Sequence, residues 1–164
     1  MDWVGNAPWP SLVASHKACI GGVMLFLDNA RILANIIMSG LLDRFPSTSF
    51  VSVESGLGWV PFLLEALDYH YSEFGAAGNL QRRPSEYFAT NFHCCFWFEK
   101  RDVSSVIARV GVDNVLFETD FPHPTCLYPV STEAVAQSLG GLDEGQVRKV
   151  LGGNAAQLYD LPLA

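Results

Sequence analysis

The sequence predicts an α/β fold built on a small parallel sheet. Three short apolar runs have strand composition, and each is separated from the next by a stretch of helical periodicity. This alternation is the pattern of βαβ units, whose strands pair in parallel. Three strands are too few to close a barrel, which needs about 250 residues. The 164 residues therefore predict one domain over 1–164, an incomplete (β/α)8 TIM-like barrel of about three strands with their helices.

The N-terminal part is predicted to be a loop followed by one helix. Residues 1–22 contain several glycines and prolines and are typical of a loop. Asp28 or Asn29 can cap a helix that continues to about Arg44 and ends before Pro46.

The first strand and the helix after it follow. Phe50 to Glu54 is the predicted strand, and the turn S-G-L-G comes directly after it. A helix is expected to begin near Pro61, since proline suits the first helical turn. A glycine-bearing turn before a helix can bind an anion. The helix is expected to bury four side chains, those of Leu63, Leu67, Tyr71 and Phe74.

The second and third strands are separated by a further helix. A polar connection over 75–84 leads to an aromatic-rich apolar run at about 92–98. A helix is predicted from Arg101 to Val110, ending at Gly111, and the third strand from Asn114 to Asp120.

Three short helices are predicted after the third strand. Ser131 or Thr132 can cap the first of them. The other two begin with capping-box-like pairs, which are Asp143 with Gln146 and Asn154 with Gln157.

Composition narrows the function classes. The net charge of −7, from 10 basic and 17 acidic residues, disfavours nucleic acid or an anionic membrane as a partner. The start M-D-W-V lacks the basic segment of a signal peptide. The most apolar stretch, Ala18 to Leu42, is interrupted by Asp28 and Arg31 and is not expected to span a membrane. We therefore expect a soluble, cytoplasmic protein.

The four cysteines are Cys19, Cys94, Cys95 and Cys126. They form no C-x-x-C pair and no disulfide framework. Buried free thiols are favoured over metal ligation.

The most informative segment for function is V-L-F-E-T-D-F-P-H-P, Val115 to Pro124. Alternation along a strand predicts that Glu118 and Asp120 share one face at its end. His123 stands between two prolines, which predicts a stiff, extended loop. A strand that ends in acids beside a histidine is how a (β/α) barrel presents a metal or acid/base site. Two simpler readings stay open: Asp120 only caps the turn, and His123 is only solvated.

A second acid, Glu54, ends another predicted strand and precedes a glycine-bearing turn. Because parallel strands end at one edge of a sheet, Glu54 and Asp120 are expected on the same rim. The candidate catalytic residues are Asp120, His123 and Glu54, and Asp120 is the candidate ligand of a cation. Glu118 is expected to support the site or to pair with an arginine. For His93, in the middle run, packing in the core is favoured over catalysis.

Three segments in series resemble a known family. G-V-D-N-V-L-F-E-T-D-F-P-H-P (111–124) resembles the last-strand signature of the amidohydrolase-related proteins. This branch of the metal-dependent hydrolase superfamily includes the aminocarboxymuconate-semialdehyde and resorcylate decarboxylases. S-V-E-S-G-L-G-W-V-P-F-L-L-E-A-L-D (52–68) is similar to its sixth-strand segment, and G-G-N-A-A-Q-L-Y-D-L (152–161) to its C-terminal helix.

The resemblance implies the last three strands of a (β/α)8 barrel that holds one divalent metal, commonly zinc. It implies that Asp120 binds the metal and takes a proton from a metal-bound water, and that His123 lies near the substrate. It implies hydrolysis or non-oxidative decarboxylation of a small carboxylated or aromatic substrate.

The sequence also departs from the family pattern. The H-x-H pair of the first strand is absent, because strands one to four are not in this chain. The fifth-strand histidine would fall near Met1 to Gly5, which contains none. Glu54 stands where several decarboxylases have a histidine. Two functions therefore stay open: the C-terminal part of a metal-dependent enzyme, or a truncated, inactive module. The module would pair its open sheet edge with a second copy or with a missing N-terminal half.

Overall fold

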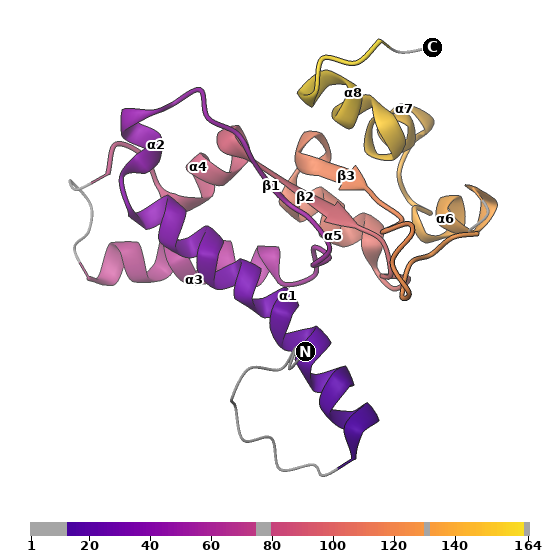
Figure 1. Ribbon diagram of the computed structural model, residues 1–164. Coiled ribbons are helices and arrows are strands. Elements are labelled where there is room, and N and C mark those ends of the chain that lie inside the picture. Colours follow the sequence, from indigo (N-terminus) through magenta and orange to yellow (C-terminus); the bar gives the residue numbers. More distant parts are fainter. Residues whose placement is uncertain (1–12, 75–79, 130–131, 163–164) are drawn as a thin grey trace.

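The structure is a computed structural model that describes residues 13–74, 80–129 and 132–162. Its centre is a three-stranded parallel sheet of β1 (Phe50–Ser52), β2 (Phe92–Phe96) and β3 (Val115–Phe117), in the order β1-β2-β3 (Figure 1). The predicted α/β class and the parallel strand order are confirmed. Since β2 lies in the middle, β1 and β3 are the two outer strands of this sheet.

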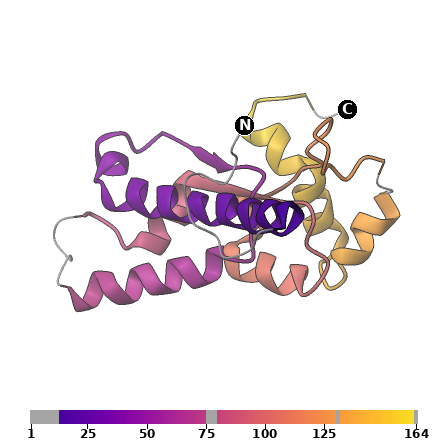
Figure 2. The ribbon, with the colours of Figure 1, turned by 60° about the horizontal axis from the view of Figure 1, so that its bottom comes forward.

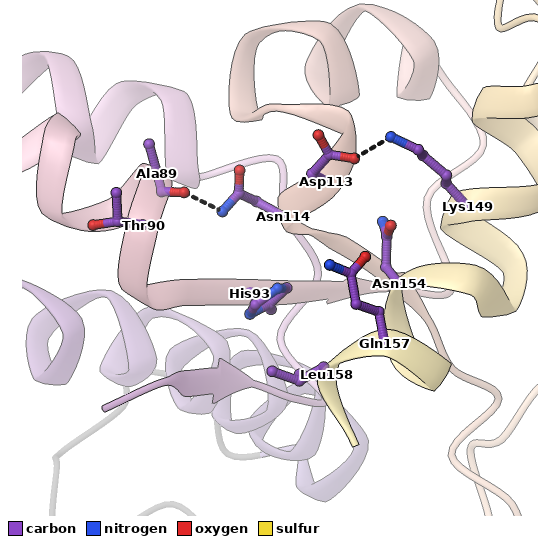
Figure 3. Close-up of a pocket in the computed structure, with 9 residues that line it drawn as sticks. All are labelled: Ala89, Thr90, His93, Asp113, Asn114, Lys149, Asn154, Gln157 and Leu158. Carbon is purple, nitrogen blue, oxygen red and sulfur yellow. Dashed lines mark hydrogen bonds and ion pairs between the residues drawn. The ribbon is translucent and has the colours of Figure 1, made fainter. Parts of the chain in front are cut away.

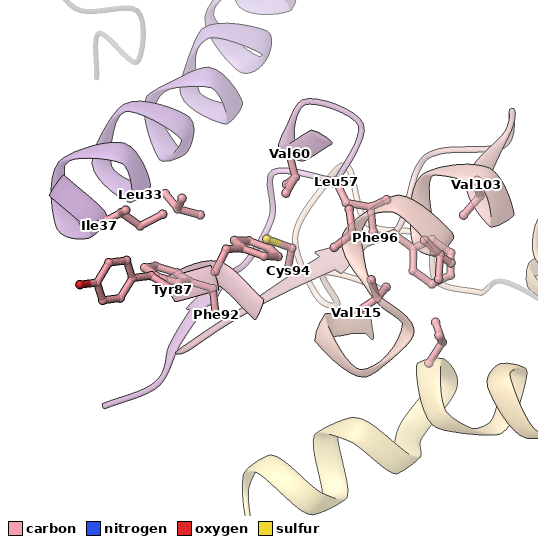
Figure 4. Close-up of a cluster of buried hydrophobic side chains, with 14 of the residues drawn as sticks. Leu33, Ile37, Leu57, Val60, Tyr87, Phe92, Cys94, Phe96, Val103 and Val115 are labelled. Atoms are coloured by element: carbon pink, nitrogen blue, oxygen red, sulfur yellow. The ribbon is translucent and has the colours of Figure 1, made fainter. Parts of the chain in front are cut away.

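One face of the sheet carries the hydrophobic core. Phe92, Cys94 and Phe96 alternate along β2 and are all buried. Because Cys94 lies in register with Val115 of β3, the same face continues onto the next strand. Figure 4 shows that side chains from several helices converge on this face. They include Leu33, Ile37, Val60, Tyr87 and Val103.

Helix α1 (Ala14–Met38) begins well before the predicted capping position. The prediction of a loop up to residue 22 is therefore wrong for residues 14–22. Two glycines inside the helix cost about 1 kcal/mol each relative to alanine, but they do not prevent helical geometry. The helix also stops earlier than predicted, because Gly40 has a φ of 70° and separates it from α2 (Leu41–Arg44).

Helix α1 packs against the rest of the described chain mainly through its second half. Gly21, Leu33 and Ile37 are its buried residues, and its first half extends away from the sheet (Figures 1 and 2). Among the described residues, α1 is the one helix that is long and apolar enough to cross a membrane, judged by length and composition alone. The expectation that residues 18–42 do not span a membrane is therefore not supported by this test of length and composition.

The connection between β1 and β2 contains two helices where one was predicted. Helix α3 (Val60–Glu73) begins beside Pro61 as expected and buries Tyr71. Phe74 was predicted to be buried, but it lies just past the helix and is 81% exposed. Helix α4 (Pro84–Asn91) was not predicted, although Pro84 and a carboxylate of Glu86 that accepts the Arg83 N–H are typical start signals.

Helix α5 (Val103–Val110) confirms the predicted helix that ends at Gly111. A 3-10 turn, η1 (Val112–Asn114), leads from it into β3. The C-terminal segments are gathered on the side of the molecule away from α2 and α4 (Figures 1 and 2). They are α6 (Thr132–Ser138), α7 (Glu144–Arg148), the π-helix η2 (Lys149–Gly153) and α8 (Asn154–Leu158).

The predicted helix starts near the C-terminus have different outcomes. The Asp143 and Gln146 capping box is present, with both reciprocal hydrogen bonds. Asn154 does not cap α8 as predicted. Its buried amide instead donates to the carbonyls of Val112 and Val115. The proposed cap at Ser131 or Thr132 lies outside the residues whose side chains are described.

Candidate active-site rim

The candidate site lies where β3 ends. The strand stops at Phe117, and one more backbone bond, from Glu118 N–H to Phe96 O at 3.2 Å, continues its pairing. Asp120 then has a φ of 59°, in the left-handed region. The period-two prediction that Asp120 follows Glu118 on one strand face is therefore wrong, because the backbone has already left the strand.

The segment after β3 is a folded loop rather than the predicted extended one. The His123 N–H donates to Asp120 O at 2.8 Å, and the Cys126 N–H donates to His123 O at 3.0 Å. The Leu127 N–H donates to Thr119 O at 2.9 Å, and this bond closes the loop. The prolines fix their own φ values, but these three bonds turn the chain back on itself.

This fold brings Asp120 and His123 into direct contact. His123 Nδ1 lies 3.0 Å from Asp120 Oδ2 and 2.9 Å from Thr125 Oγ1. The Asp120 side chain is only 10% exposed, whereas that of His123 is 47% exposed. In this arrangement the carboxylate contacts the imidazole, and the imidazole has a partner although it is half exposed. With Nδ1 engaged, Nε2 is the nitrogen available to a substrate.

Glu54 and Glu118 also meet at this edge. The Glu54 N–H donates to Glu118 Oε1 at 2.6 Å, and Glu54 has a φ of 57°. Since β2 lies between β1 and β3, this bond crosses the carboxyl end of the middle strand. The structure therefore brings the loops after β1 and β3 together, as the parallel order predicted.

Several carboxylates share this rim. Burial raises the pKa of Glu118 above its ordinary value. The charges of Glu54 and Asp120 raise that pKa further, while hydrogen bonds from the Glu54 N–H and the Cys95 thiol oppose the rise. Excess negative charge at the mouth of a parallel sheet suits a cation or a protonated group.

A carboxylate missed by the sequence reasoning, Glu99, organises the turn after β1. Its Oε1 accepts the Leu57 N–H at 2.7 Å and the Gly58 N–H at 3.4 Å. A glycine-bearing turn of this kind can bind an anion, and here the Glu99 carboxylate of the protein itself accepts the N–H groups of the turn before α3. A signal was present, because Glu99 follows the second apolar run just as Glu54 follows the first.

The cysteines beside the site are buried free thiols. Cys94 and Cys95 are both buried, as predicted, whereas Cys19 is exposed. Burial raises the pKa of Cys94 to about 12. Burial, and then the carboxylate of Glu118, raises the pKa of Cys95 as well. Neither thiol is therefore a nucleophile near neutral pH.

A pocket lies at the opposite, amino end of the strands. Figure 3 shows His93 of β2 across this pocket from Gln157 and Leu158 of α8. The cavity is about 520 Å³ in volume. Burial lowers the pKa of His93, and its Nδ1 is buried without a hydrogen-bond partner in the described structure. In (β/α) barrels this end serves stability, so the pocket is separate from the candidate site.

The described residues do not by themselves make a metal site. Among them, no group of three or more His, Cys, Asp or Glu side chains is placed to hold a metal ion. Asp120 offers one carboxylate, and His123 already contacts it. A zinc ion needs about four ligands, so further ligands would have to come from outside the described residues.

The chain belongs to the amidohydrolase family, whose model matches residues 24–161. It is 26% identical over 112 residues to the gamma-resorcylate decarboxylase of Rhizobium sp. strain MTP-10005, covering 65% of this chain and 34% of that protein. The family resemblance inferred from three sequence segments is thereby confirmed.

Solved structures agree with this assignment. An amidohydrolase from Mycobacterium avium subsp. paratuberculosis K-10 matches with a TM-score of 0.70 and 26% identity, over 85% of this chain and 35% of that one. The 5-carboxyvanillate decarboxylase of Sphingomonas paucimobilis matches with a TM-score of 0.61 and 31% identity, over 79% of this chain and 38% of that one. The chain thus spans between a third and a half of the length of these relatives.

One solved relative bears on the metal. The dihydroxybenzoic acid decarboxylase of Polaromonas sp. JS666, at 20% identity and a TM-score of 0.65 over 96% of this chain and 49% of that one, contains manganese and the inhibitor 2-nitroresorcinol. A divalent metal agrees with the family, but nothing in these relatives specifies zinc.

Proposed function

We propose that this chain forms the last three strands and the active-site rim of a metal-dependent amidohydrolase-family enzyme. The reaction is non-oxidative decarboxylation, or hydrolysis, of a small aromatic carboxylate. The observation that carries the proposal is the meeting of Glu54, Glu118 and the Asp120–His123 pair at the carboxyl end of the sheet. Decarboxylases among the relatives support the reaction class.

The roles follow from the geometry of the pair. Asp120 contacts Nδ1 of His123, which fixes the orientation of the ring and leaves Nε2 outside this contact, on a side chain that is 47% exposed. His123 can therefore hold or transfer a proton, or bind the substrate carboxylate, at Nε2. Glu118 keeps Glu54 at the same rim through the bond to its N–H. Asp120 is also the proposed metal ligand, with the other ligands supplied from outside the described residues.

A catalytic assay tests this function. The chain is incubated with manganese or zinc and either 2,6-dihydroxybenzoate or 5-carboxyvanillate, and loss of the substrate carboxylate is followed. Metal-dependent turnover that disappears in Asp120→Asn supports the proposal. Asp113→Asn is a matched control, because Asp113 is an exposed carboxylate at the amino end of the sheet that pairs with Lys149. Turnover that is unaffected by Asp120→Asn contradicts the assigned role.

A second candidate is a module that is inactive alone. The observation that favours it is the lack of a complete metal-binding group among the described residues. Metal analysis separates the two readings. A stoichiometric divalent ion in the purified chain, lost in Asp120→Asn, supports an enzyme site, whereas a metal-free chain without turnover supports the module.

A further inference from the structure

We propose that the outer face of helix α3 is a contact surface between two copies of this chain, whose α3 helices pack antiparallel about a twofold axis at Ala66. We call this surface the α3 stripe; it comprises Phe62, Ala66, Tyr69, His70 and Phe74. The stripe lies on the outside of the fold, so this contact does not depend on the function proposed for the rim.

The α3 stripe exposes large aromatic side chains. Phe62, Tyr69 and Phe74 are 76%, 60% and 81% exposed. The ring centroid of His70 lies 5.1 Å from that of Tyr69 and 5.3 Å from that of Phe74. Single exposed apolar side chains are ordinary on a protein surface. Aromatic side chains gathered on one face are instead typical of the buried centre of a protein interface.

The packing of α3 is complete on its inner side. Val60 and Tyr71 are buried in the core, and Leu63, Leu64 and Leu67 pack against it. The neighbours of α3 are α1, α4 and α5, which all belong to the described chain. Figure 2 shows α3 along an edge of the molecule. The stripe is therefore not a surface that another strand of the sheet would cover.

The order of residues in the stripe is self-complementary. Phe62 lies four residues before Ala66, and Tyr69 and His70 lie three and four residues after it, so all four share one side of the helix. A twofold axis at Ala66 makes the two helices antiparallel, and each Phe62 then meets Tyr69 and His70 of the other copy. The small side chain of Ala66 at the centre permits the interaxial distance of about 8–10 Å that packed helices adopt.

The charges beside the stripe favour a second copy as the partner. Glu65 precedes Ala66 and lies 3.5 Å from Arg109 of α5, and both of these side chains are exposed. In a twofold dimer each copy brings one acid and one base to the same edge, so Glu65 of one copy can face Arg109 of the other. An edge with both signs does not select a strongly acidic or strongly basic protein. The net charge of −7 also disfavours an anionic membrane.

The ends of the two helices are complementary as well. Glu73 lies seven residues after Ala66, and Trp59, the N-cap residue of α3, lies seven residues before it. The side chain of Trp59 makes no cap hydrogen bond. The twofold axis places the exposed Glu73 of one copy beside the N-terminus of α3 of the other copy. Negative charge is favourable at that end of a helix.

The exposed aromatic area suits the centre of a dimer interface. A fully covered aromatic side chain buries about 150–250 Å². At their exposed fractions, Phe62, Tyr69 and Phe74 together offer on the order of 400 Å² per copy. A standard interface buries about 800 Å² on each partner, so these three side chains supply roughly half of it.

Sedimentation equilibrium of the purified chain tests the contact. Standard interfaces have dissociation constants from micromolar to picomolar, so at a loading of about 100 μM we expect twice the chain mass of 18.0 kDa. Phe62→Glu should raise the dissociation constant by about tenfold or more, because a charge then enters the centre of the interface. Leu27→Glu is the matched control, since Leu27 is an apolar residue on α1 with 45% exposure. Circular dichroism establishes that both variants remain folded.

Cross-linking tests the antiparallel arrangement. Ala66→Cys and Glu73→Cys are made separately in a chain that also carries Cys19→Ser and Cys126→Ser, because the two other native thiols are buried. Each protein is treated with a short bismaleimide. The twofold axis brings the two thiols introduced at Ala66 side by side. It separates those introduced at Glu73 by about 21 Å, at about 1.5 Å per residue. A covalent dimer should therefore form with Ala66→Cys and not with Glu73→Cys.

Three results would overturn the proposal. The first is a chain that stays monomeric at this concentration, and the second is a dimer that Leu27→Glu disrupts and Phe62→Glu does not. The third is a covalent dimer that forms through Glu73→Cys and not through Ala66→Cys. If the chain is monomeric and Phe62→Glu abolishes its binding to phosphatidylcholine vesicles, a lipid surface covers the stripe instead of a second copy. Turnover enters none of these measurements, so failure of the proposed function is distinguished from failure of the dimer.

Discussion

The carboxylate of Glu99 accepts the Leu57 N–H at 2.7 Å, which fastens the loop after β2 to the turn before α3. The same oxygen lies 3.4 Å from Gly58 N, and the other carboxylate oxygen accepts the Trp97 N–H at 3.3 Å. One side chain thus satisfies backbone donors from two loops of the rim. These hydrogen bonds fix the positions of the two loops relative to each other.

Glu99→Ala should destabilise the chain by about 1–3 kcal/mol, because partly buried N–H groups lose their acceptor. Urea unfolding followed by circular dichroism measures the change. Glu65→Ala is the control, since Glu65 makes only an exposed pair with Arg109 at 3.5 Å, and such pairs contribute about 0–1 kcal/mol. Equal effects of the two substitutions would show that the Glu99 bonds add no stability.

Gly56→Ala should be more harmful than Gly58→Ala. Gly56 has a φ of 65°, and a Cβ at that position would collide with the Glu99 carboxylate. Gly58 has nothing within 4 Å of its Cβ position. We expect a loss of roughly 1–3 kcal/mol for Gly56→Ala and a change within about 0.5 kcal/mol for Gly58→Ala. A similar thermal unfolding midpoint for both variants would contradict the conformation of this turn.

The raised pKa of Glu118 predicts a pH dependence of stability. Between the ordinary pKa of the unfolded state and the raised pKa of the folded state, the folded chain binds more protons. Stability therefore falls as the pH rises through this window, and the full penalty is present above it. Glu118→Gln should remove this fall, because it keeps an acceptor for the Glu54 N–H without the charge.

Unfolding free energies of the wild type and of Glu118→Gln, measured at several pH values, give the test. The difference between them should favour the variant increasingly as the pH rises through the window. A difference that is constant with pH, or of opposite sign, would show that the folded carboxyl has no raised pKa.

The thiols should fall into two classes. Cys19 is exposed and Cys126 half-buried, whereas Cys94 and Cys95 are buried and have raised pKa values. Ellman's reagent should therefore modify two thiols quickly in the folded chain and all four after unfolding, because only accessible thiolates react. Fast reaction of a third thiol would show that one of the two faces of β2, the one with Cys94 or the one with Cys95, opens to solvent.

The sequence predicted well what depends on local pattern. The apolar runs marked the three strands, and the intervening helices required a parallel order, which placed Glu54 and Asp120 at one edge. The capping box of Asp143 and Gln146 could be predicted because both partners lie within one helical turn. These features are decided within a few residues or by chain connectivity alone.

What could not be predicted depends on partners distant in sequence. The role of Glu99 follows from a contact with Leu57, 42 residues away. Asn154 resembles a helix cap in the sequence, but two carbonyls near β3 bind its amide instead. The left-handed conformation of Asp120 follows from the bonds that close its loop. A single sequence does not show which of several polar partners a side chain selects.

The bond from Glu54 N–H to Glu118 has a consequence for ligand binding at the rim. This hydrogen bond connects the loop after β1 to the loop after β3 across the end of β2. The relative position of the two loops is therefore fixed by contacts within the chain itself. A surface that is already ordered loses little conformational entropy when a second body meets it. A ligand that binds at this rim should therefore meet loops that are already ordered, and its binding should lose little free energy to their ordering.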